Sequence, residues 1–231
     1  MPTIPEITEM LKAGVHFGHK TSRWHPKMAE YIFGERGGVH IVDLEKTAVK
    51  LQEALNFLSD VASRGGIVLL VGTKPQGAGI VKAAALEAGM PYVDKRWLGG
   101  TLTNFHAIHN VVKRYLDLKG KTERGELDKY TKKEQLGFQK EIIDLETKVG
   151  GLVGLDKMPQ AIFILDMKKE NTALAEAIQS RVPIVAICDT NVNPENVEYV
   201  IPANDDAVKS IQMIVGLAAE AIKEGKSKQV K

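Results

Sequence analysis

The sequence has little cysteine, no long apolar run and almost no net charge. The single cysteine, Cys188, excludes an intramolecular disulfide and indicates a reducing cytosol. No apolar run approaches the roughly 18 residues that a membrane span needs, and residues 1–11 lack the basic and apolar regions of a signal peptide. We therefore expect a cytoplasmic protein that does not enter a membrane. The net charge of +2, from 31 Lys and Arg against 29 Asp and Glu, does not by itself indicate nucleic-acid binding.

The charged residues are distributed unevenly along the chain. Residues 1–116 carry 14 Lys and Arg against 10 Asp and Glu, whereas residues 117–231 carry 17 against 19. All six histidines also lie in the first half. Because this imbalance is small, a single Lys or Arg is by default a solvated surface residue. A nucleic-acid partner has to be argued from the places where basic residues cluster.

The hydrophobic pattern predicts an α/β protein. In the N-terminal part we expect a helix over residues 7–13 ended by Gly14, a loop over residues 14–28, a hairpin of strands 31–33 and 39–43, and a helix over residues 44–63. Apolar runs then predict strands at residues 67–71, 91–93, 161–165, 184–188 and 199–201. Helices are expected between or after them, at residues 77–88, 171–179 and 205–223, the last capped by Asn204 or Asp205. This alternation indicates a three-layer, doubly wound, mostly parallel sheet.

Residues 104–150 do not fit that alternation. They contain no buried-strand pattern, and residues 111–148 carry 10 basic and 8 acidic side chains. The pattern predicts two helices, at residues 104–118 and 131–149, with Gly120 and Gly125 between them. The second helix would be about 28 Å long. We expect an antiparallel helical hairpin that projects from the sheet and grips a large partner. The four lysines of residues 223–231 suggest a mobile basic tail.

Residues 72–79 (GTKPQGAG) form the most enzyme-like motif, because they follow a buried strand and precede a helix. Both phosphate-loop patterns are incomplete. Ala78 and Gly79 stand where a Walker loop needs Lys and Ser or Thr, and Lys82 stands at the third glycine of a dinucleotide fingerprint. Asp94 could imitate the ribose-binding acid of that fingerprint. The alternatives are a nucleotide- or dinucleotide-binding enzyme and a tight strand-to-helix turn in which Lys74 could still meet a phosphate.

Histidine and aspartate suggest a metal site. The candidate ligands for Mg²⁺ or Zn²⁺ are His19, Asp189 and Asp205, with Asp206 next to Asp205. The three aspartates would lie at the carboxyl edge of the sheet, where ligands gather. Hydrogen-bonded or solvated side chains are the competing interpretation. The sequence contains no G-x-S-x-G elbow, and Cys188 lacks the electropositive setting of a nucleophile. We therefore expect no catalytic site.

Aromatic and basic residues alternate in two predicted loops. Lys20, Arg23, Trp24 and Lys27 lie in the first loop, and residues 96–100 (RWLGG) form the second. An exposed Trp can stack on an unpaired base while Lys or Arg neutralises a phosphate. The competing interpretation is that both tryptophans pack against the sheet and anchor their loops.

A series of motifs in these regions resembles a known family. The series consists of residues 13–19 (AGVHFGH), 23–24 (RW), 26–28 (PKM), 41–47 (IVDLEKT), 71–74 (VGTK), 96–104 (RWLGGTLTN), 189–191 (DTN) and 200–206 (VIPANDD). In this order it resembles the bacterial small-subunit ribosomal protein two family, over essentially the whole chain. Two places depart from the family pattern: His25 stands where the family usually has Asn, and residues 75–79 are less basic than is typical.

The resemblance implies a flavodoxin-like α/β domain with an inserted coiled-coil hairpin and no enzymatic activity, cofactor or small-molecule substrate. It implies a ribosome-bound protein that holds small-subunit rRNA between head and body, contacts neighbouring small-subunit proteins, and helps recruit the mRNA-binding small-subunit protein one. Combined with the loops above, it gives these candidate RNA-binding residues: His16, His19, Lys20, Arg23, Trp24, Lys27, Lys74, Arg96, Trp97, Lys113 and Arg114. The expected domains are a discontinuous α/β domain (residues 1–103 and 151–225), the inserted hairpin (104–150) and a basic tail (226–231). A module that docks onto protein through the hairpin alone is a third interpretation.

Overall fold

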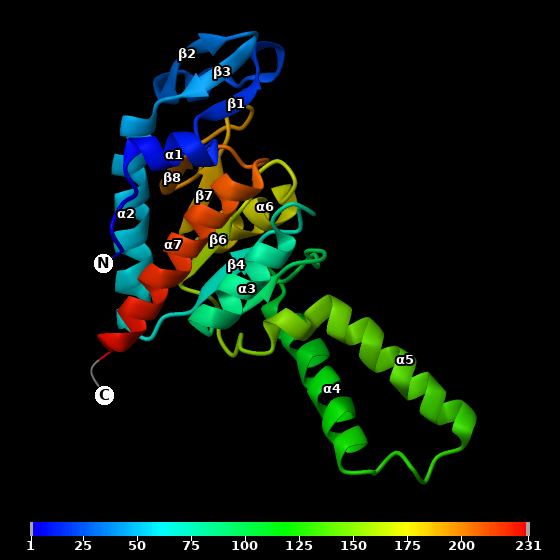
Figure 1. Cartoon of the computed structure of the whole chain (residues 1–231). Coiled ribbons are helices and arrows are strands. Elements are labelled where there is room, and N and C mark those ends of the chain that lie inside the picture. The colour runs from blue at the N-terminus through cyan, green and yellow to red at the C-terminus, as the bar shows by residue number, and fades with distance from the viewer. Residues whose placement is uncertain (1, 230–231) are drawn as a thin grey trace.

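A five-stranded parallel sheet forms the centre of the protein (Figure 1). The computed structural model describes residues 2–229. The strands are β4 (Val68–Val71), β5 (Tyr92–Val93), β6 (Ala161–Ile164), β7 (Ile184–Cys188) and β8 (Tyr199–Pro202). They lie in the order β5-β4-β6-β7-β8, and every neighbouring pair is parallel. This is the strand order of flavodoxin-like sheets, and it confirms the predicted mostly parallel sheet.

Helices cover both faces of this sheet. α2 (Leu44–Ser63), α3 (Ala78–Ala88) and α7 (Val208–Ser227) share one apolar core with Leu70 and Phe163. α6 (Asn171–Ser180) and parts of α4 (Phe105–Glu123) and α5 (Lys132–Val149) share a second core with Leu69 and Ile162. Successive strand residues point to opposite faces, so each apolar strand supplies both cores. The three predicted layers are confirmed.

Three N-terminal strands form a second, antiparallel sheet. β2 (Ile32–Arg36) and β3 (Val39–Val42) make the expected hairpin, and β1 (Phe17–Lys20) pairs with the other edge of β3. The prediction of a loop over residues 14–28 is therefore wrong for β1, and the short 3₁₀ helices Thr21–Arg23 and Pro26–Tyr31 follow it. β1 was not predicted because its residues show no alternation of apolar and polar side chains. Its conformation depends on pairing with β3.

Two N-terminal helices begin and end close to where the sequence places them. α1 (Ile7–Ala13) ends at Gly14, whose φ of 77° needs glycine. α2 has the predicted bounds. The side chain of Asp43 caps its first turn by accepting hydrogen bonds from the amides of Glu45 and Lys46 at 3.0 and 3.4 Å.

The predicted bounds of α7 are wrong by three residues at the start and four at the end. Asn204 caps the preceding turn instead of the helix: its Oδ1 accepts from the amides of Asp206 and Ala207 at 2.7 and 3.0 Å. The helix then begins at Val208 and continues to Ser227, so Lys226 and Ser227 are helical rather than part of a tail. Of the predicted basic tail, residues 230 and 231 lie outside the described residues.

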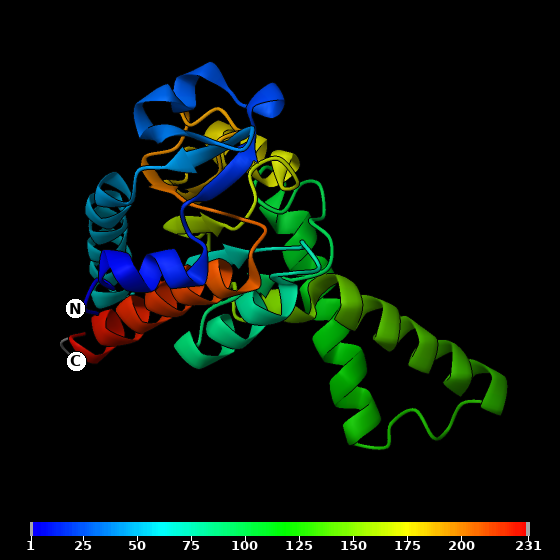
Figure 2. The same cartoon turned by 45° about the horizontal axis from the view of Figure 1, so that its top comes forward.

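α4 and α5 form an arm that projects away from the sheet, as both ribbon views show (Figures 1 and 2). α4 ends five residues later than predicted and runs through Gly120. α5 begins at a capping box in which Thr131 and Glu134 hydrogen-bond each other's backbone amides. Arg114 of α4 donates to Glu141 of α5 at 2.6 Å. The two helices diverge toward the tip, and a coiled-coil pairing stays a prediction.

Within residues 2–229, none of the helices is both long enough and apolar enough to cross a membrane.

Candidate nucleic-acid interface

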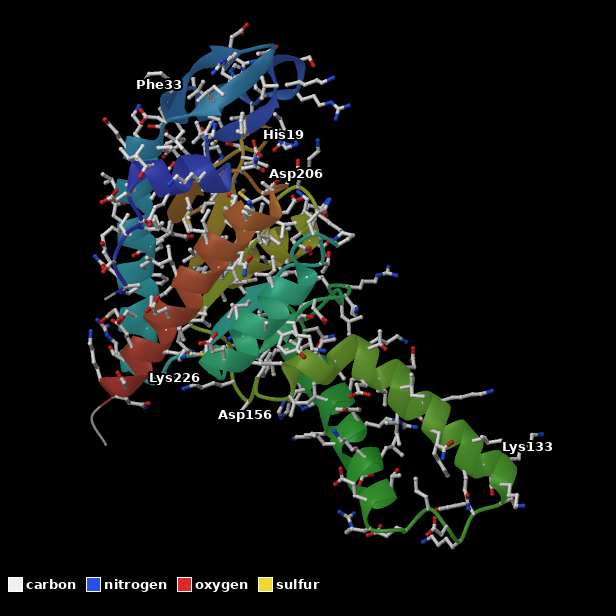
Figure 3. The ribbon with its side chains drawn as sticks, viewed as in Figure 1. His19, Phe33, Lys133, Asp156, Asp206 and Lys226 are labelled. Atoms are coloured by element: carbon white, nitrogen blue, oxygen red, sulfur yellow. The ribbon has the colours of Figure 1, made fainter. Side chains whose placement is uncertain are left out.

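Charged side chains gather at the carboxyl edge of the parallel sheet, the edge where ligands of such folds bind. The group, which we call the edge cluster, consists of His19, Lys74, Asp166, Asp189, Asp205 and Asp206. Lys74 Nζ lies 3.1 Å from Asp166, 2.8 Å from Asp205 and 2.7 Å from Asp206. His19 lies 3.1 Å from Asp189 and 3.5 Å from Asp206, and Figure 3 shows His19 and Asp206 close together.

The carboxylates of the edge cluster favour the protonated, positively charged forms of Lys74 and His19. Burial lowers the pKa of the Lys74 ammonium, but its hydrogen bonds to Asp205 and Asp206 outweigh that effect and raise it. Burial, together with the neighbouring Asp166 and Asp189, raises the pKa of Asp205 to about 7. The hydrogen bond with Asp189 raises the pKa of His19. Lys74 is therefore a charged, nearly buried group held by carboxylates. These partners occupy its ammonium, which disfavours the phosphate contact that was considered for it.

The edge cluster contains the donor types that a metal ion needs. Atoms of His19, Asp205 and Asp206 lie within 4.8 Å of one another, and an imidazole with two carboxylates suits Zn²⁺ or Mg²⁺. The predicted ligands also included Asp189, which does not belong to this group. Asp189 instead accepts from Thr190 and lies against the Nδ1 atom of His19, which orients the imidazole. Because the Lys74 ammonium already contacts both Asp205 and Asp206, a metal ion would have to displace it.

The loop of residues 72–79 is a tight turn with little room for a phosphate. A Cβ at Gly77 would lie 2.2 Å from Leu165, and one at Gly72 would lie 2.7 Å from Val81. The amide of Thr73 donates to Glu170 at 2.8 Å, and the amides of Gly77 and Ala78 donate to the Lys74 carbonyl at 2.9 and 2.8 Å. These glycines therefore serve close packing of β4 and α3, which disfavours the nucleotide-binding alternative.

Seven of the candidate RNA-binding residues are exposed, and their side chains come from β1, its following turns, the β5–α4 connection and α4. They are Lys20, Arg23, Trp24, Lys27, Arg96, Lys113 and Arg114. Lys27 contacts Glu195 at 2.5 Å, and Arg114 contacts Glu141. Trp24 is 40% exposed, and its ring lies 5.2 Å from that of His40. This exposure favours the first of the two interpretations for Trp24, and base stacking by it stays a prediction.

Trp97 and His16 are exceptions among the candidates. Trp97 is buried, and its indole N–H donates to Glu176 at 3.0 Å, so the prediction that it stacks on an unpaired base is wrong. The competing interpretation, an anchor for its loop, holds for this residue. Burial lowers the pKa of His16, so its neutral form is favoured and it is poorly suited to a phosphate.

Glu176 is the residue of this region that sequence reasoning missed. It is buried, and its carboxylate accepts hydrogen bonds from Trp97, Gly100, Leu102 and Thr103. A signal existed, because Glu176 lies three residues after Ala173 on the buried face of α6. A carboxylate at an apolar position of a helix has to have partners inside the protein.

An apolar groove lies between α1 and the antiparallel sheet and was not predicted. It has a volume of about 340 Å³, and its lining includes Ile7, Leu11, His16, Phe33 and Ile41. Phe33, labelled in Figure 3, is 80% exposed, and Ile7 and Leu11 are 43% and 45% exposed. Exposed apolar side chains gathered in a groove are typical of a protein-binding surface. Ile7 and Leu11 lie four residues apart on one helix face, which is the signal that could have indicated this surface.

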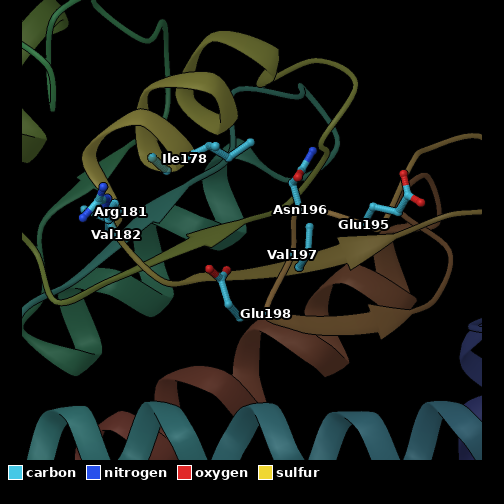
Figure 4. A pocket seen from close by; sticks show the side chains of 8 residues that line it. Ile178, Arg181, Val182, Glu195, Asn196, Val197 and Glu198 are labelled. Carbon is cyan, nitrogen blue, oxygen red and sulfur yellow. The ribbon is translucent and has the colours of Figure 1, made fainter.

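A second cavity, of about 410 Å³, lies beside α6 and the β7–β8 connection (Figure 4). Two of its acidic side chains already have partners: Glu195 contacts Lys27, and Glu198 accepts from the amide of Ile184 at 2.8 Å. None of the predicted site residues lines this cavity. The described residues that line it offer no group of free convergent polar atoms that would identify a ligand.

The chain matches a protein-family model over most of its length. The model described as ribosomal protein S2 matches residues 10–225. The matched region includes the edge cluster, the exposed basic residues and the arm.

Proposed function

Because this chain belongs to the ribosomal protein S2 family, we propose that it binds small-subunit rRNA between the head and body and helps recruit the mRNA-binding small-subunit protein one. The family consists of structural proteins of the small ribosomal subunit, which act in translation as part of a ribonucleoprotein and normally have no enzymatic activity. The match across residues 10–225 is the observation that carries the proposal. We infer that the protein works in the cytoplasm, bound to the ribosome.

Exposed cations support the RNA contact. Lys20, Arg23 and Lys27 lie in and after β1, and Arg96 lies before the arm. Each can neutralise a backbone phosphate and release condensed counterions. Backbone contacts of this kind position a protein on folded RNA without reading its sequence. The mechanism is steric and electrostatic: the loops bind phosphates while the arm extends between partners.

Co-sedimentation tests this role. Small subunits depleted of their S2 protein are mixed with the full-length chain and separated on gradients at low and high salt. We expect stoichiometric binding at low salt, loss at high salt, and weaker binding of the triple variant R23A/K27A/R96A. The matched control R64A/K209A/K228A removes the same charge from three exposed residues: one directly after α2, one in α7 and one directly after α7. Equal behaviour of the two triple variants would move the RNA surface to the arm.

The apolar groove supports the second part of the proposal. A protein partner that buries Phe33 and Leu11 would remove their apolar surface from water. Each Å² removed contributes about 25 cal/mol of favourable binding free energy. We expect Phe33→Ser to leave the free energy of unfolding within about 0.5 kcal/mol of wild type, because the side chain is exposed. The same variant should lower the amount of the mRNA-binding protein on reconstituted subunits. Full recruitment by F33S would place that partner elsewhere.

The enzyme alternative has its own test. A nucleotide present at a hundred times its dissociation constant would stabilise the fold by about 2.7 kcal/mol. We expect no change in melting temperature with NAD or ATP, since Leu165 closes the loop after β4 and the amides of Thr73, Gly77 and Ala78 already have acceptors.

A further inference from the structure

Glu176 receives an unusual set of hydrogen bonds. Its Oε1 accepts from the Trp97 indole at 3.0 Å and the Gly100 amide at 2.8 Å. Its Oε2 accepts from the amides of Leu102 and Thr103 at 2.9 and 3.2 Å and from the Thr103 hydroxyl at 3.2 Å. Five neutral donors from one short segment therefore converge on one carboxylate.

The charge of Glu176 is maintained by these donors. Burial opposes its ionisation, but the hydrogen bonds from Trp97 and the backbone amides outweigh burial and lower its pKa. Backbone amides that point into one concavity are the arrangement with which proteins bind phosphate. Here the concavity is filled by a carboxylate of the same chain. The segment of residues 97–103 is thus folded around an anion supplied by α6.

The positions of Arg96 and of the start of α4 depend on where this segment lies. Arg96, exposed, directly precedes Trp97, and α4 begins two residues after Thr103. The Gly100 amide reaches Glu176 from a backbone with φ of 91°, a conformation that favours glycine. Without the carboxylate, the three amides would lose their acceptor, and the link between the sheet and the arm would lose its attachment to α6.

We propose that Glu176 is a positioning residue that holds the segment of residues 97–103 in its binding conformation and thereby sets the place of Arg96 and the root of α4. The effect on binding rests on the proposed function, because it requires that Arg96 contacts the subunit. The effect of Glu176 on the conformation of residues 97–103 does not rest on the proposed function.

Hydrogen exchange of the free, full-length protein tests the positioning. In Glu176→Gln one acceptor oxygen becomes an amide donor that faces N–H groups. We expect the amides of Gly100, Leu102 and Thr103 to exchange at least about tenfold faster, which corresponds to about 1.4 kcal/mol, while amides of β4 and β6 keep their rates. Glu170→Gln is the matched control: it alters another buried carboxylate, which holds Thr73. If E176Q does not fold, Trp97→Phe removes one donor only and should shift the same amides less.

Binding to S2-depleted small subunits tests the consequence. We expect E176Q to weaken binding about tenfold, E170Q to leave it unchanged, and E176Q/R96A to bind no more weakly than R96A alone, since coupled residues are not additive. Unchanged exchange in E176Q, additive losses in the double variant, or an equal loss in E170Q would overturn the proposal. If R96A binds like wild type, the RNA role of this segment fails, and the exchange rates still decide whether Glu176 holds it.

Discussion

At the turn after β4, two neighbouring glycines meet different surroundings. A Cβ at Gly77 would lie 2.2 Å from Leu165, whereas one at Gly79 would have nothing within 4 Å. The sequence indicated only that this turn requires glycine. It could not say which glycine is required, because the constraint comes from Leu165, at the end of another strand. The same limit applies to Glu176, whose partners lie more than seventy residues away in the chain.

The glycines give a direct test of this packing. We expect Gly77→Ala to lower the free energy of unfolding by about 1 to 3 kcal/mol, because the added methyl overpacks the core. Gly79→Ala should be neutral or stabilise by up to about 1 kcal/mol, because alanine favours the helix. Urea denaturation of the two variants measures the difference. Equal effects would show that Leu165 does not restrict Gly77.

Glu176 also predicts a dependence on pH. Its folded pKa is lowered below the ordinary value of 4.5, so the stability that it contributes is present above pH 4.5 and is lost as the pH falls through the folded pKa. We expect wild type to lose more stability than Glu176→Gln when the pH is lowered from 5 to 3. Denaturation midpoints at each pH test this, and parallel curves for the two proteins would contradict it.

At the scale of helices and strands, the spacing of apolar residues predicted the elements whose bounds depend on that spacing alone. The apolar spacing gave α2 its observed bounds, and the apolar runs gave the five strands of the parallel sheet within two residues at each end. The sequence missed β1, which needs β3 as a partner, and it misplaced the start of α7, because Asn204 caps a turn before the helix. Of the candidate site, the exposed cations were predicted. The sequence left two interpretations of Trp97 open and could not decide between them, because the partner of its indole, Glu176, lies on α6.

The arm offers a prediction for one element. Thr131→Ala removes the side chain that accepts from the Glu134 amide and should cost about 1 kcal/mol in the first turn of α5. Hydrogen exchange of that turn measures the loss. Thr147→Ala, an exposed position within the same helix whose hydroxyl donates to the Ile143 carbonyl, should leave the first turn unchanged. A similar change in both variants would mean that Thr131 does not hold the helix end.

At the scale of the whole molecule, two kinds of surface lie on different parts of one framework. The exposed cations lie in and after β1, before α4 and on α4, whereas the apolar groove lies between α1 and the antiparallel sheet. This separation permits simultaneous contact with RNA and with a protein. The net charge of +2 gave no sign of the basic surface, because acidic residues elsewhere in the chain cancel its local excess of positive charge.

Salt dependence measures the RNA contact of the whole molecule. Each phosphate neutralised on a duplex contributes about −0.9 to the slope of log K against log salt. We expect R23A/K27A/R96A to reduce the magnitude of that slope by about 2 to 3 in binding to S2-depleted subunits. R64A/K209A/K228A should leave it unchanged. A parallel shift without a change of slope would mean that the three residues act through folding.

The place of the arm within the chain has a consequence for synthesis. Leu70 of β4 pairs with Phe163 of β6, and the whole arm is translated between them. Because translation adds about 5 to 20 residues per second, β6 is made several seconds after β4. Of the two described strands that pair with β4, β5 alone has been made during that interval, so one edge of an apolar strand stays open to other chains. A newly made chain is therefore most at risk of aggregation while its arm is being translated, and a chaperone that binds extended apolar segments would act in this interval.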